Sequence, residues 1–154
     1  MGMEQSFRNG KDQSPMLHED GFVYVRYTYD PSGKVVTQSH FGANGLPVLR
    51  KGGDFAMEYS YDNRGDVIQR AHLDRSGDPV VTSLGFARVV GVRDDKGRLV
   101  EERYLDTKGN AVLNKYGYCL LRRVFDPRGK AEATYFDLAG RQLSENTSRP
   151  GPIL

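Results

Sequence analysis

The 154-residue chain has no tryptophan, a single cysteine and no long apolar run. The single cysteine, Cys119, excludes an internal disulfide framework. No segment approaches the roughly 20 apolar residues that cross a bilayer, and the start of the chain lacks the apolar stretch of a signal peptide. We therefore expect neither a membrane span nor a leader in this sequence. The compartment stays open, and the cell envelope or secretion would fit a fragment of a larger protein.

An excess of one charge is also missing, because 22 Lys and Arg face 20 Asp and Glu. This composition does not indicate a nucleic-acid partner. Glycine and aromatic rings are plentiful instead, with 18 Gly, 9 Tyr and 7 Phe, while 38% of the residues are hydrophobic. That combination is typical of a folded domain made of short strands and tight turns. We therefore predict an all-β protein.

Many of the glycines recur at a spacing of 32 residues, which indicates an internal repeat. The three columns are Gly21, Gly53, Gly85 and Gly117, then Gly33, Gly65, Gly97 and Gly129, and finally Gly45, Gly77, Gly109 and, after a one-residue deletion, Gly140. We predict four tandem 32-residue β-hairpin repeats in an antiparallel array. Their bounds are 21–52, 53–84, 85–116 and 117–146, within one β domain of residues 21–146. The pattern leaves an open sheet, a barrel and a solenoid as alternatives.

The two ends of the chain lie outside this pattern. Residues 1–20 are polar and aperiodic, so we predict a flexible N-terminal tail. Residues 147–154 contain Pro150, Gly151 and Pro152, a spacing unsuited to strand or helix, and we predict a C-terminal tail there.

Each predicted hairpin closes on a turn that begins with Asp and ends with Gly, as in Asp30-Pro31-Ser32-Gly33. The Asp carboxylate can accept a hydrogen bond from the backbone two residues later, and Gly tolerates positive φ at the last position. These are features of a type I turn followed by a bulge. The equivalent turn residues begin at Asp62, Asp94 and Asp126.

Two of these turns share a Tyr-Asp-x-x-Gly core, at residues 29–33 and 61–65. This core resembles the YD repeats of bacterial RHS proteins and animal teneurins, and the resemblance extends loosely over residues 21–143, although the unit here is longer. In that family the repeats form large β shells or cell-surface scaffolds and are linked to carbohydrate binding. The resemblance implies an interaction or scaffolding role, in a bacterium.

The sequence contains no constellation that predicts catalysis. No serine lies in a Gly-x-Ser-x-Gly context, and the glycines that follow strands do not open a helix that could bind phosphate. His40 and His72 lack a third ligand nearby for zinc, and the Asp that opens each turn acts in the turn itself, without the alternating acids of a calcium loop. We therefore predict no catalytic residues, no metal site and no cofactor.

One column of rings is the candidate ligand-binding site. It comprises four equivalent positions, namely His40, His72, Tyr104 and Tyr135. Amphipathic rings in a row can form a platform for sugars or peptides. The alternative is that these rings only pack across strands and stabilise the sheet.

The favoured function is a non-enzymatic interaction or scaffolding module with a carbohydrate or protein partner. Two alternatives remain. One is a hydrolase of polysaccharides with two free carboxylates about 5 to 10 Å apart across a groove. The other is a scaffold fragment of a larger toxin or surface protein.

Overall fold

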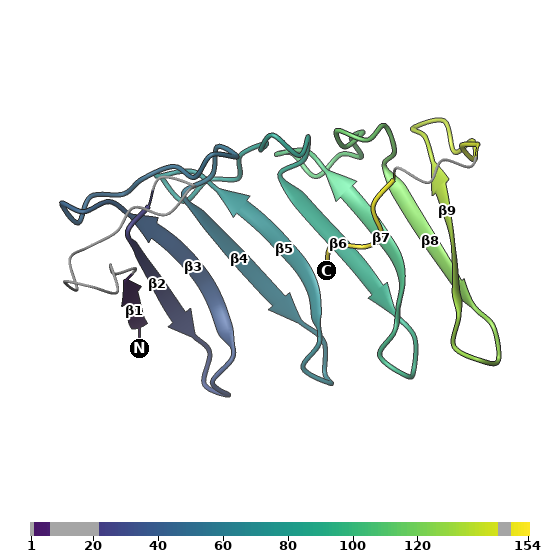
Figure 1. Ribbon diagram of the computed structural model, residues 1–154, viewed down its shortest axis with the longest axis horizontal. Coiled ribbons are helices and arrows are strands. Elements are labelled where there is room, and N and C mark those ends of the chain that lie inside the picture. The colour runs from purple at the N-terminus through teal and green to yellow at the C-terminus, as the bar shows by residue number, and fades with distance from the viewer. Residues whose placement is uncertain (1, 7–21, 145–148) are drawn as a thin grey trace, which may run out of the picture.

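The computed structural model describes residues 2–6, 22–144 and 149–154. Within these residues the chain forms one open antiparallel sheet of nine strands and no helix (Figure 1). The strands are β1 (Gly2–Ser6), β2 (Tyr24–Tyr29), β3 (Val35–Phe41), β4 (Ala56–Tyr61), β5 (Val67–Leu73), β6 (Arg88–Arg93), β7 (Leu99–Leu105), β8 (Leu120–Phe125) and β9 (Ala131–Phe136). Their order in the sheet follows their order in the chain. The predicted all-β antiparallel class is confirmed, and the sheet is open.

The tight turns within the hairpins have the predicted Asp and Gly interactions, as the turn between β6 and β7 illustrates. The N–H of Gly97 donates to the carbonyl of Asp94 over 3.0 Å. Asp94 Oδ1 accepts hydrogen bonds from the N–H groups of Lys96 at 3.0 Å and Arg98 at 2.9 Å. Gly97 has a φ of +81°, a conformation that a side chain disfavours. The Asp residues therefore act in the turns, as predicted.

The connections between hairpins are longer and contain two further tight turns. After β3, the chain turns and returns along the strand, with a single bridge between Phe41 and Pro47. A further turn runs from Arg50 to Gly53, whose N–H donates to the Arg50 carbonyl over 2.8 Å. Equivalent turns lie beside each other, because the N–H of Ser83 donates to the carbonyl of Gly52 over 2.9 Å. The connections therefore form a layer joined by hydrogen bonds at the upper ends of the strands in Figure 1.

The hydrophobic core lies on one face of the sheet, because alternate residues of a strand point to the same side. Its cluster consists of Phe86, Val89, Tyr104, Tyr118 and Leu121. Half-buried apolar side chains of the connections pack against this cluster, namely Leu84, Val112 and Leu143. The sheet and its own connections thus provide the two sides of the core.

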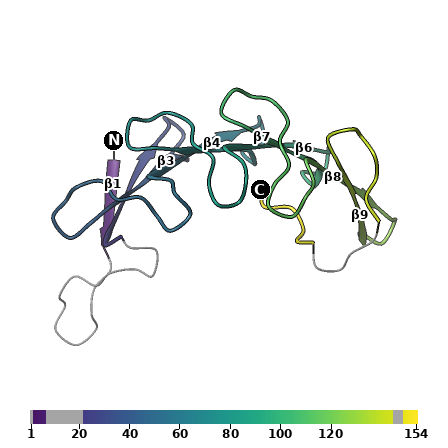
Figure 2. The same cartoon turned by 90° about the horizontal axis from the view of Figure 1, so that it is seen from above.

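The described residues include parts of both predicted tails. Residues Gly2–Ser6 form β1 and pair with β2, so an added strand covers the edge that β2 would expose. Residues 7–20 of the predicted N-terminal tail lie outside the described residues. The segment Arg149–Leu154 has no regular structure, and its end, marked C in Figure 2, lies on one side of the sheet. Ile153 and Leu154 pack against the core cluster. The predicted C-terminal tail is therefore a docked segment over residues 149–154.

Candidate functional site

The four residues of the predicted ring column occupy matching register positions in their hairpins. They pair with residues on the preceding strand as Val25 with His40, Met57 with His72, Val89 with Tyr104 and Leu121 with Tyr135. All four lie on the core face of the sheet. The exposed fractions are 0% for His40, 2% for His72 and 1% for Tyr104, whereas Tyr135 is half-buried.

Aromatic side chains from outside the strands cover the column. Phe22 lies 4.5 Å from His40, measured between ring centroids. Phe86 lies between His72 and Tyr104, at 5.7 Å and 5.1 Å. The expectation of an exposed ring platform therefore does not hold for these three rings, because a ligand could reach them only by displacing packed side chains. They serve cross-strand packing, which was the alternative interpretation.

One connection brings a buried carboxylate to this row. Asp54 follows the Arg50–Gly53 turn, and its Oδ2 lies 2.7 Å from Nδ1 of His72. Arg50 donates to both carboxylate oxygens, from Nε at 2.9 Å and from a terminal nitrogen at 2.7 Å. Burial alone would raise the pKa of Asp54, but the hydrogen bonds from His72 and Arg50 outweigh it and hold the pKa well below its usual range. Asp54 is therefore ionised, and His72 donates from Nδ1.

The other ring nitrogen of His72, Nε2, is buried and has no hydrogen-bond partner among the described residues. His72 lines a hollow of about 140 Å³ together with Asp54, Thr82 and Ser83. The sequence analysis missed Asp54, although a signal was present. At the 32-residue spacing its column otherwise holds Phe22, Phe86 and Tyr118, so an acidic residue stands where three units have a ring.

A second buried carboxylate, Glu102 on β7, holds the C-terminal segment. Its oxygens accept hydrogen bonds from the backbone N–H groups of Ile153 at 2.9 Å and Leu154 at 3.0 Å. The Tyr104 hydroxyl also donates to Glu102. Burial raises the pKa of Tyr104 far above its usual value, and the neighbouring Glu102 charge raises it further. Tyr104 is therefore a hydrogen-bond donor throughout the physiological pH range.

The start of the segment is held by rings at the far end of the sheet. The Tyr135 hydroxyl donates to the carbonyl of Pro150 over 3.0 Å, and Tyr118 does so over 3.4 Å. The Arg149 guanidinium lies 5.3 Å from the Tyr135 ring centroid, within the range of a cation–π contact. Tyr135 is thus the one member of the predicted column that contacts the segment with its hydroxyl.

Gly91 on β6 makes room for the end of the segment. It pairs with Glu102, and a Cβ atom at this position would lie 2.6 Å from Leu99 Cδ1 and 2.7 Å from Leu154 Cδ1. At the 32-residue spacing the equivalent positions are Tyr27 and Tyr59, which carry large side chains where Gly91 has none. We call the surface formed by Gly91, Glu102, Tyr104, Tyr118 and Tyr135 the docking face. The docking face holds the segment through hydrogen bonds to its backbone, and the Ile153 and Leu154 side chains also pack on the core.

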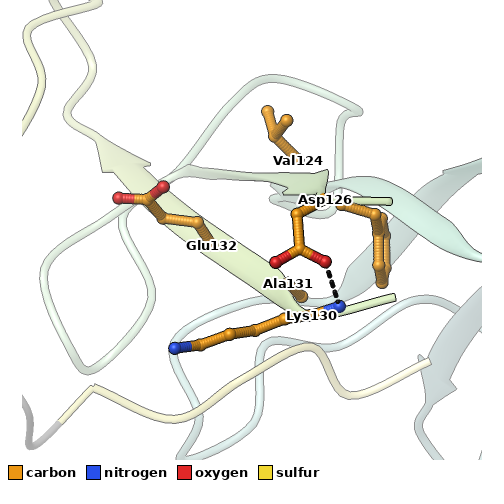
Figure 3. Close-up of a pocket in the computed structure, with 6 residues that line it drawn as sticks. Val124, Asp126, Lys130, Ala131 and Glu132 are labelled. Carbon is orange, nitrogen blue, oxygen red and sulfur yellow. Dashed lines mark hydrogen bonds between the residues drawn. The ribbon is translucent and has the colours of Figure 1, made fainter. Parts of the chain in front are cut away.

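Another hollow lies at the end of the β8–β9 hairpin and has a volume of about 430 Å³ (Figure 3). Two acidic residues line it, Asp126 and Glu132. Asp126 Oδ1 accepts hydrogen bonds from the N–H groups of Arg128 and Lys130, both at 2.9 Å, so it acts in its own turn. Figure 3 shows the Glu132 carboxylate pointing away from Asp126. This arrangement does not resemble a pair of free carboxylates across a groove.

Within the part of the chain that the structure describes, no group of three or more His, Cys, Asp or Glu side chains could hold a metal ion. No helix among the same residues is long and apolar enough to cross a membrane. Comparisons with protein-family models and with curated protein sequences found no match. The resemblance to YD repeats therefore rests on the Tyr-Asp-x-x-Gly turns.

Proposed function

We propose that this chain is a non-enzymatic interaction module that binds an extended polypeptide on the docking face. The observation that carries the proposal is the pair of hydrogen bonds from the Ile153 and Leu154 N–H groups to Glu102. Every residue except proline has such an N–H group, so a separate chain in the same conformation could make these bonds. Gly91 supplies the space for an apolar side chain beside them.

The burial of the ring column favours a polypeptide partner over a carbohydrate. Sugars bind to open aromatic faces, whereas His40, His72 and Tyr104 are covered. The docking face instead offers a carboxylate to backbone N–H groups and the Tyr135 hydroxyl to a backbone carbonyl. These groups complement a peptide backbone.

We infer further that the sheet consists of four 32-residue units, which makes the module a repeat scaffold. Strands β2, β4, β6 and β8 begin at Tyr24, Ala56, Arg88 and Leu120, a constant step that supports this inference. In such an array each unit packs mainly on its neighbours and offers equivalent positions along one face. The turns that resemble YD repeats support a scaffold role in a bacterial protein, either alone or within a larger surface protein.

The proposal is tested with a variant of the whole 154-residue chain in which the C-terminal segment no longer binds the docking face. We call it the open variant. Ile153→Pro with Leu154→Pro removes both N–H donors to Glu102 and adds no charge. We expect a labelled, amidated peptide of residues 149–154 to bind this open variant saturably, measured by fluorescence anisotropy. The matched control peptide carries the same two prolines and should not bind. Glu102→Gln in the open variant should weaken binding about tenfold, because it removes a charged acceptor.

Folding of each variant is checked by circular dichroism, so that loss of binding is not loss of structure. Absence of saturable binding to a folded open variant would overturn the proposal. A glycan array incubated with the same variant tests the other partner class. Saturable binding of a glycan without binding of the peptide would replace the polypeptide with a carbohydrate.

A further inference from the structure

The docking face continues beyond Leu154 toward β5, where Arg70 lies. The segment runs from Tyr135 on β9 to Glu102 on β7 and ends beside Gly91 on β6 (Figure 1). Arg70 pairs with Val89, two residues from Gly91 on the same strand. Val89 and Gly91 are alternate residues of β6 and share a face, and paired residues on neighbouring strands also share a face. Arg70, which pairs with Val89, therefore lies on the same side of the sheet as Glu102, which pairs with Gly91. Arg70 therefore lies on the face that the segment crosses, one strand beyond Gly91.

Arg70 is equivalent in the 32-residue spacing to Glu102, so the two positions offer opposite charges. Glu102 is satisfied by Tyr104 and by the segment. Arg70, in contrast, is half-buried, and within the described residues it forms no ion pair and its buried Nε has no hydrogen-bond partner. Burial lowers the pKa of this guanidinium, and the nearby Tyr59, Glu102 and Asp54 offset that effect only in part.

We propose that Arg70 binds a carboxylate of the polypeptide that occupies the docking face, an inference that rests on the proposed function. A guanidinium and a carboxylate form two parallel charge-assisted hydrogen bonds, which matches the fork geometry of Arg. The carboxylate would restore the interactions that burial removes from Arg70. The partner is therefore an extended peptide with an apolar residue at the Gly91 gap, followed by an acidic residue or a chain terminus.

Two peptides that differ in one residue test this inference on the open variant, Ile153→Pro with Leu154→Pro. Both carry residues 149–154, followed by Glu in one and Gln in the other, and both are amidated so that the terminus adds no charge. We expect the Glu peptide to bind about tenfold more tightly at low salt. Raising the salt concentration should reduce this difference, because ions screen the interaction.

Arg70→Gln in the open variant should abolish the difference and leave the Gln peptide binding unchanged. The matched control is Arg88→Gln, because Arg88 precedes Val89 on β6 and lies on the opposite face of the sheet. That control should retain the difference. Equal binding of the two peptides would overturn the role of Arg70 while the proposed function stands, whereas binding of neither peptide would overturn both.

Discussion

His72 Nδ1 donates a hydrogen bond to Asp54 Oδ2 over 2.7 Å, and both side chains are buried. This bond joins a connection between hairpins to the core face of the sheet, because Asp54 precedes β4 and His72 lies on β5. Arg50 supplies the compensating charge from the adjacent turn. The layer of connections is therefore attached to the sheet by a charged network as well as by apolar packing.

The ion pairs of Asp54 predict that the protein loses stability at acid pH. Asp54 has a folded-state pKa below its ordinary value of 3.8, so the unfolded chain binds a proton first as pH falls. The stabilisation from Asp54 is complete above about pH 4 and decreases below it. We expect Asp54→Asn to lower the free energy of unfolding by about 3 kcal/mol at pH 7. Its loss of stability between pH 5 and pH 3 should be smaller than that of the wild type.

Urea denaturation at several pH values measures both effects. Asp95→Asn is the matched control, because Asp95 is an exposed turn residue. It should keep the wild-type pH dependence. If Asp54→Asn lost as much stability between pH 5 and pH 3 as the wild type does, the assignment of Asp54 as an ionised buried group would be contradicted.

The second prediction concerns alkaline pH and Tyr104. Its pKa is raised by burial and by Glu102, so the unfolded chain loses this proton at a lower pH than the folded protein does. The stabilisation is therefore complete below about pH 10 and decreases as the pH rises above it. Tyr104→Phe should lower the free energy of unfolding by about 1 to 2 kcal/mol at pH 7, because Glu102 loses one donor. It should also reduce the loss of stability above pH 10.

Denaturation at pH 7 and pH 10.5 tests this, with the exposed Tyr116→Phe as the control. Amide hydrogen exchange adds a local measurement. Protection of the Ile153 and Leu154 N–H groups should decrease in Tyr104→Phe, because Tyr104 positions their common acceptor. Unchanged protection and unchanged stability would show that the hydroxyl does not support Glu102.

The third prediction separates backbone strain from crowding in the hairpin turns. Gly97 and Gly129 have φ values of +81° and +86°. Each Gly→Ala change should lower the free energy of unfolding by about 1 kcal/mol. A Cβ at Gly97 would also lie 3.1 Å from Asp66 Oδ2, whereas nothing lies within 4 Å at Gly129. The cost at Gly97 should therefore be the larger one.

Gly97→Asn is the matched variant, because Asn adopts positive φ more readily than Ala. It should retain more stability than Gly97→Ala in chemical denaturation. Midpoints of Gly97→Ala and Gly129→Ala equal to that of the wild type would contradict the turn assignment.

The turns of the hairpins were predictable because their determinants are local. Asp94 and Gly97 stand three residues apart, and their hydrogen bonds and φ values depend on little outside the turn. The turn before β4 was not assigned from the sequence, although its Gly53 lies in a recognised column. Its first position varies among Arg50, Thr82 and Asn114, so no turn-forming side chain marks it consistently.

The candidate site was predicted only in part. Periodicity correctly placed His40, His72, Tyr104 and Tyr135 on one face, because strand residues alternate between two sides. It did not indicate that Phe22, Phe86 and Tyr118 would cover that face, since these rings lie in connections whose path depends on packing. Exposure is a property of the assembled molecule, and it cannot be derived from spacing along a strand.

By itself, the sequence determined the all-β class, the antiparallel pairing of neighbours and the chemistry of the Asp-to-Gly turns, because each depends on residues close together in the chain. The tertiary structure alone decided that residues 149–154 lie on the sheet, that Glu102 accepts their N–H groups and that, among the described residues, the buried Nε of Arg70 has no hydrogen-bond partner. Glu102 and Leu154 are 52 residues apart in sequence. Contacts over that separation form when the folded sheet places the gap at Gly91 beside the buried charge of Glu102. Because these residues come together only in the folded sheet, a local sequence pattern cannot predict the contact.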